Sequence, residues 1–196
     1  MLDEKEIDRA KKNFERLIKE GIVTKRKEKK FINFFLSNAK NSLDSAKLLF
    51  DVSTKNDLKD LTGFPDFNGF LWVVNSSYYS MFYVVRALLE KEGVEIKTDE
   101  SIHAAVFGAL IYYFYSTGKL QKKFIEEFAE ANAETVEILG KEKAKELVED
   151  YFHEKNKRGI LTYEMGVIAM QNKAETSLDR AKKFNEEIRK IIETKK

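Results

Sequence analysis

The chain has 196 residues, enough for one domain whose core is stable without disulfides or metal. It contains no cysteine, which excludes a disulfide framework and any thiolate-ligated zinc or iron–sulfur centre. The 35 basic and 33 acidic residues nearly cancel, so no overall charge draws the protein to nucleic acid or to a membrane. A single proline and nine glycines favour long helices joined by few loops, and we predict an all-α fold.

The first two predicted helices are amphipathic. "EIDRAKKNFERLIKEG" has apolar residues at helical spacing and ends at Gly21, a residue type that closes helices. Its acidic start resembles neither a secretory nor a transit signal, so we expect the chain to remain in the cytoplasm. A second helix, from about Phe31 to Val52, has one apolar stripe made of Phe35, Ala39, Leu43, Ala46 and Leu49 or Phe50.

A loop over residues 53–69, marked by Pro65 and several Gly and Asn residues, precedes a third helix from Phe70 to about Glu92. This helix is apolar on nearly every side, but the run from Phe70 to Val85 is too short and too interrupted to span a membrane. We therefore expect a buried helix and no membrane partner. Its serines are interpreted as spacers, and its tyrosines as buried rings whose hydroxyls bond at the ends of the bundle or in an interface.

Four more helical segments follow, and the pattern as a whole predicts an up-and-down bundle. Gly93 closes the third helix, and Thr98 or Asp99 can cap the next one. Residues 1–22 are expected to form an additional N-terminal helix, and residues 30–194 the bundle. The predicted segments are 100–116, 119–140, 141–157 and a long last helix over 160–193.

Three stretches resemble HEPN domains, the higher eukaryotes and prokaryotes nucleotide-binding family. "SSYYSMFYVVRALLEKEGVEIKTDESIHAAV" is similar to their central helix, loop and following helix, and "KRGILTYEMG" with "AETSLDRAKKFNEEIRKII" is similar to their last helix. "FLSNAKNSLDSAKLLF" resembles their first helix. The resemblance implies a HEPN-type α-bundle that forms homodimers, is often encoded beside a nucleotidyltransferase, and in many members is a metal-independent ribonuclease of toxin–antitoxin systems.

The family's nuclease motif is an Arg followed four to six residues later by a His, so the resemblance implies a site at Arg158. Here the residue five positions later is Tyr163, not His. RNA cleavage without metal needs a base, an acid and a cation. Arg158 supplies the cation, but a tyrosine with a pKa near 10 is a poor base at neutral pH. The enzyme assignment therefore stays open, with absence of catalysis favoured.

The only two histidines do not complete this site. His103 is expected to cap or bridge the start of a helix. His153 lies five residues before Arg158, which places the two side chains about 140° apart on a continuous helix, so they converge only if the helix breaks near Asn156. No helix carries a Glu-x-x-His or His-x-x-x-His pair, and no phosphate-binding or dinucleotide-binding glycine motif occurs. We predict no metal and no cofactor.

Two basic stretches are candidates for phosphate binding. The first is "TKRKEKK", from Thr24 to Lys30, which is also typical of a solvated helix end. The second is "EKNKR", which places Lys155 and Lys157 beside Arg158. The candidate ligand-binding set is therefore His153, Lys155, Lys157, Arg158 and Tyr163.

Three functions remain open from the sequence. The first is a homodimeric binding module that holds RNA or a nucleotide near Arg158 or sequesters a partner such as a nucleotidyltransferase. The second is a ribonuclease with a degenerate Arg/Tyr motif. The third is a non-catalytic helical adaptor for a protein partner.

Overall fold

The computed structural model describes residues 2–98, 102–145 and 160–194, with backbone alone at 139–145, 160–167 and 169. Helices account for most of this length. In chain order the elements are α1 (Glu4–Lys19), β1 (Val23–Lys25), α2 (Ile32–Thr54), α3 (Asn56–Thr62), α4 (Phe70–Lys91), β2 (Val94–Ile96), α5 (Ile102–Leu110), η1 (Ile111–Tyr115), α6 (Lys122–Lys145) and α8 (Ile160–Glu193).

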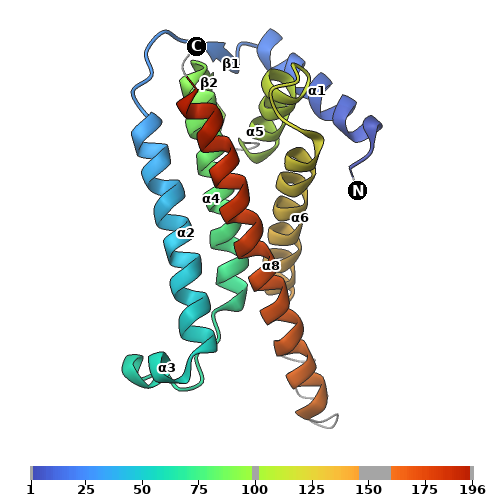
Figure 1. Cartoon of the computed structure of the whole chain (residues 1–196). Helices are drawn as coiled ribbons and strands as arrows, with labels where there is room; N and C mark the ends of the chain where they lie inside the picture. The colour runs from blue at the N-terminus through green and yellow to red at the C-terminus, as the bar shows by residue number, and fades with distance from the viewer. Residues whose placement is uncertain (1, 99–101, 146–159, 195–196) are drawn as a thin grey trace.

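The four long helices α2, α4, α6 and α8 run alternately down and up along one direction (Figure 1). The predicted all-α, up-and-down bundle is therefore confirmed, whereas its assignment to the HEPN type stays a prediction. The predicted bounds of the helices over 31–52, 70–92 and 160–193 agree with α2, α4 and α8 to within two residues.

The core of the bundle is built around α4, which packs against α2, α5, α6 and α8. Val73, Met81, Val84 and Leu88 of this helix are completely buried. Burial of such side chains is the main source of stability, at about 1.5–3 kcal/mol each. Only one stripe of α4 reaches the surface, on the side turned away from this core.

Helix α1 begins at Glu4 because Asp3 and Glu6 form a capping box, in which the Asp3 carboxylate accepts from the Glu6 N–H at 2.7 Å. Its Phe14 side chain is buried against α5, where Gly108 leaves room for it. A Cβ at position 108 would lie only 2.8 Å from the Cβ of Phe14. The N-terminal helix therefore shares the core of the bundle.

Two short strands were not predicted from the sequence. β1 and β2 pair antiparallel, with Thr24 opposite Glu95, and so tie the segment after α1 to the segment after α4. Gly93 precedes β2 with a φ of 72°, and a Cβ there would lie 2.3 Å from the Arg26 carbonyl oxygen, so this position requires glycine. Three-residue strands are too short to show a period of two, which explains the omission.

Three further predictions are corrected. The segment 53–69, predicted as a loop, contains α3 before its turn at Gly63. The helix predicted over 100–116 changes at Ile111 into a π-helical turn, shown by the bond from the Ser116 N–H to the Ile111 carbonyl. The boundary predicted at Gly140 does not exist, because α6 continues through it to Lys145.

Candidate functional site

The residues that the sequence singled out cannot be placed in a site. His153, Lys155, Lys157 and Arg158 lie outside the described residues, and only the backbone of Tyr163 is described, in the first turns of α8. The groove around Arg158 therefore stays a prediction.

The basic stretch from Thr24 to Lys30 is partly structural. The Arg26 guanidinium forms ion pairs with Glu90, whose side chain is only 3% exposed, and with Glu95 at 3.2 Å. The second carboxylate oxygen of Glu90 accepts from the Phe31 N–H at 3.1 Å. Arg26 thus joins β1 to α4 and β2, and its charge already has two partners.

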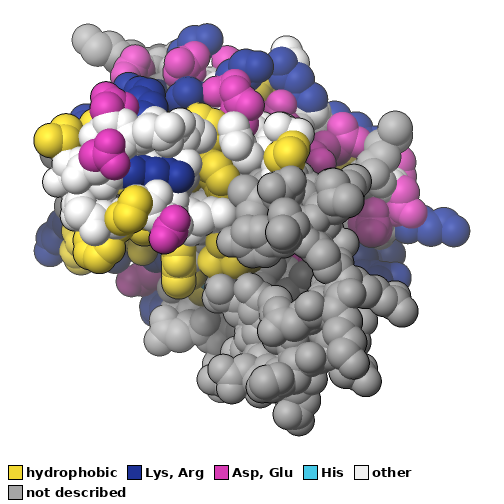
Figure 2. Space-filling model, turned by 90° about the horizontal axis from the view of Figure 1, so that it is seen from below, with side chains coloured by type: hydrophobic (Ala, Val, Ile, Leu, Met, Phe, Trp, Pro, Cys, Tyr) yellow, Lys and Arg dark blue, Asp and Glu magenta, His cyan; other side chains and the backbone are white. Residues whose placement is uncertain are grey.

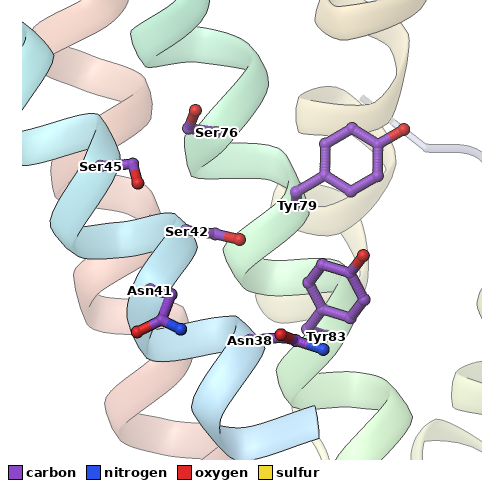
Figure 3. Close-up of a pocket in the computed structure, with 7 residues that line it drawn as sticks. All are labelled: Asn38, Asn41, Ser42, Ser45, Ser76, Tyr79 and Tyr83. Carbon is purple, nitrogen blue, oxygen red and sulfur yellow. The ribbon is translucent and has the colours of Figure 1, made fainter.

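A polar groove of about 350 Å³ lies between α2 and α4 (Figure 3). α2 contributes two amides and two hydroxyls from successive turns, because its residues 38, 41, 42 and 45 share one face. α4 contributes one hydroxyl and two phenol rings. The lining residues are Asn38, Asn41, Ser42, Ser45, Ser76, Tyr79 and Tyr83.

None of these seven side chains hydrogen-bonds to another described residue. Several serines and threonines elsewhere bond within the protein, such as Ser53 to the Leu49 carbonyl at 2.6 Å and Thr117 to the Tyr113 carbonyl at 2.8 Å. The groove therefore presents amide, hydroxyl and phenol groups whose hydrogen-bonding capacity the described structure does not use.

Outside the groove, Ser80 and Tyr78 of α4 are paired, whereas the buried Ser77 hydroxyl and Asn75 amide oxygen have no hydrogen-bond partner among the described residues. The Ser80 hydroxyl donates to the Ala39 carbonyl at 2.8 Å and accepts from the Asn185 amide at 2.9 Å, which links α2, α4 and α8. Tyr78 hydrogen-bonds to Nδ1 of His103 at 2.6 Å. Burial raises the pKa of Tyr78 and lowers that of His103, so at neutral pH the phenol donates to a neutral imidazole.

His103 thus joins the first turn of α5 to α4, whereas the predicted cap at this helix start stays a prediction. The His103 ring also packs against Phe82, with 4.6 Å between ring centroids. The serines of α4 were interpreted as spacers that allow close contact between helices. This agrees with Ser80, which lies at a close contact with α2, and is incomplete for Ser76, which lines the groove.

Two aromatic rings form one wall of the groove. The ring centroids of Tyr79 and Tyr83 are 6.1 Å apart with an interplanar angle of 36°, and Figure 3 shows the two rings side by side along α4. One turn beyond Tyr83, the Arg86 guanidinium lies 4.7 Å from the ring centroid of Phe35. Aromatic rings and neutral hydrogen-bonding groups therefore line the groove, and the Arg86 guanidinium lies beyond one end of it.

The lining residues carry no carboxylate, imidazole or ammonium. Within the described ranges, no group of three or more His, Asp or Glu side chains could hold a metal ion. The arrangement is suited to binding.

A signal for the groove is present in the sequence. Residues 38, 41, 45 of α2 and 76, 79, 83 of α4 follow the spacing of three and four that marks one helix face, and all six are polar or phenolic. Sequence reasoning missed the groove because it followed the apolar stripe of each helix and not the polar one.

Comparison with protein-family models, curated proteins and solved structures finds no match for this chain. The resemblance to HEPN domains therefore stays a prediction. Among the described residues, no helix is both long enough and apolar enough to span a membrane.

Proposed function

We propose that this protein is a non-catalytic binding module for RNA or a nucleotide, and that the α2–α4 groove receives a base. The observation that carries the proposal is that seven polar side chains line one groove without a hydrogen bond to another described residue. Unused donors and acceptors at a recessed site indicate a ligand that supplies the complementary groups.

The lining suits a base in particular. Asparagine amides present a donor and an acceptor side by side, the arrangement that reads the edge of adenine. The rings of Tyr79 and Tyr83 offer faces for stacking, which is the usual way in which proteins hold unpaired bases. Arg86 lies one turn beyond Tyr83 with its guanidinium over the rings of Phe35 and Phe82, and we expect its positive charge to favour an anionic ligand.

Binding without cleavage agrees with the chemistry of both candidate sites. The groove holds no general base among its lining residues. The sequence motif has Tyr163 where the ribonuclease motif has His. The resemblance to HEPN domains supports a further part of the proposal, a homodimer that acts in a toxin–antitoxin system or beside a nucleotidyltransferase, and the neighbouring reading frames test that part.

The proposal is tested by titrating fluorescent RNA oligonucleotides and mononucleotides with wild-type protein and with Tyr83→Ala. Loss of the ring should weaken binding by about 1–3 kcal/mol, the usual cost of removing one stacking side chain. Tyr83→Phe is the matched variant, since it keeps the ring and removes only the hydroxyl, and should retain most of the affinity. Tyr115→Ala, in η1, serves as a control away from the groove.

Arg158→Ala, titrated in parallel, tests the site implied by the resemblance. Cleavage of the oligonucleotides is scored in the same samples. Equal affinity of Tyr83→Ala and wild type would contradict the base site in the groove. Rapid cleavage by the wild type would contradict the non-catalytic assignment.

A further inference from the structure

The α2–α4 groove lies at the centre of a larger face that no described helix covers. On α2, Phe34 and Leu48 are each seven residues from Asn41, so all three lie on one side of the helix. On α4, Trp72 and Arg86 are each seven residues from Tyr79 and share a side in the same way. We call these six residues the α2–α4 face.

Three of the four residues at the ends of this face are apolar and exposed. Phe34 is 57% exposed, Leu48 63% and Trp72 50%. Phe34 and Arg86 lie at the same end, since Arg86 contacts Phe35, the residue after Phe34. Leu48 and Trp72 lie at the other end, because α2 and α4 are antiparallel (Figure 1).

The face is complementary to itself. Consider a two-fold axis that lies in the plane of the face, crosses both helices and passes Asn41 and Tyr79. A rotation of 180° about this axis exchanges the two ends of the face. Phe34 of one copy then meets Leu48 of the other, and Trp72 meets Arg86, a favourable pairing of an indole with a guanidinium. Beside this stripe on α2, Lys40 and Asp44 form an ion pair within each copy, and the rotation brings the two pairs together with opposite charges facing.

We propose that two copies of this chain pack through the α2–α4 face, with α2 antiparallel to α2 and α4 antiparallel to α4. A two-fold contact uses the same patch on both copies and so requires this self-complementarity. The exposed Phe34, Leu48 and Trp72 are then buried. Leu61 of α3 and Phe64 just after it are exposed as well. At the end of the molecule seen in Figure 2, apolar side chains are interspersed with charged ones.

This inference specifies the homodimer named in the proposed function, and it places the two grooves opposite each other. A nucleotide in the groove would therefore be enclosed between the copies. The dimer does not depend on that ligand, so it is tested without any nucleotide present. Failure of nucleotide binding and failure of the dimer are thus separate results.

The chain has no cysteine, so single cysteine variants report proximity without background. A disulfide needs Cα atoms within about 7 Å. Asn41→Cys lies at the axis and should form a covalent dimer under mild oxidation. Phe34→Cys alone should not, because its two copies are about 21 Å apart along α2, whereas a mixture of Phe34→Cys and Leu48→Cys should cross-link.

Val136→Cys is the control, since Val136 is 62% exposed on α6 and lies off this face. Cross-linking of Asn41→Cys no faster than Val136→Cys would overturn the proposal. So would cross-linking of Asn41→Cys only when mixed with Tyr79→Cys, because that result places α2 of one copy over α4 of the other.

The mass of the uncross-linked protein gives an independent measurement. Light scattering should report a dimer for wild type and for Val136→Lys, and a monomer for Trp72→Lys, which places a second positive charge against Arg86. Circular dichroism of each variant checks that the fold is retained. A monomeric wild type, or a dimer unaffected by Trp72→Lys, would overturn the proposal.

Discussion

The two sides of α4 use the same residue types for different purposes. On the core side, Ser80 and Tyr78 are buried and hydrogen-bonded to other helices. On the open side, Ser76, Tyr79 and Tyr83 have no hydrogen bond to another described residue and line a groove. For these residues the helix face decides whether the hydroxyl bonds to another helix or faces the groove, whereas the buried Ser77 hydroxyl has no partner among the described residues.

The largest loss of stability is expected from a substitution of Arg26. This residue pairs with the buried carboxylate of Glu90 near the end of α4. Arg26→Ala leaves that charge without its main partner and should lower the free energy of unfolding by about 3 kcal/mol. Urea denaturation measures the change. Arg16→Ala, which breaks the exposed pair with Glu20, should cost less than about 0.5 kcal/mol, and similar losses for both would contradict the role given to burial.

The sharpest test of the contrast compares two serines four residues apart on α4. Ser80→Ala removes bonds to α2 and α8 and should lower the free energy of unfolding by about 1–2 kcal/mol. Ser76→Ala, on the open side, should change it by no more than about 0.5 kcal/mol. Equal effects in thermal or urea unfolding would mean that the two faces do not differ as described.

The smallest effect is a pH dependence from His103. Burial lowers the pKa of His103 in the native protein below 6.5, the ordinary value that applies to the unfolded chain. At a pH between these two pKa values, the unfolded chain therefore binds more protons than the native one. The free energy of unfolding should therefore fall as the pH drops through 6.5 and be unaffected by His103 above it. Burial raises the pKa of Glu127 above the ordinary value of a glutamate, so the native protein holds this proton more tightly than the unfolded chain. The contribution of Glu127 to the free energy of unfolding therefore increases as the pH falls, opposite to that of His103.

This dependence is measured as the difference between wild type and His103→Gln in unfolding experiments across that range. Glu127 and the other titrating groups are common to both proteins, so their contributions cancel in the comparison. A difference that grows on the alkaline side of 6.5 would contradict the assignment of a partly buried neutral imidazole.

The bundle could be predicted from the sequence because α2, α4 and α8 are long enough to show several turns of apolar spacing. The strands β1 and β2 could not, since their pairing joins residues about 70 positions apart and depends on the bundle being formed. Ser76 and Ser80 look alike in the sequence, and only the positions of α2 and α8 show which one faces the core. The site around Arg158 rests on the resemblance alone.

The contact between α4 and α8 also bears on the order of folding during synthesis. The Lys91 ammonium, at the end of α4, donates to the carbonyls of Ile191 and Thr194 at the end of α8, about 100 residues later. Until α8 has left the ribosome, the apolar side of α4 that it covers stays exposed. The nascent chain therefore completes its core only after α8 emerges, and the interval before that is when it most needs protection from aggregation.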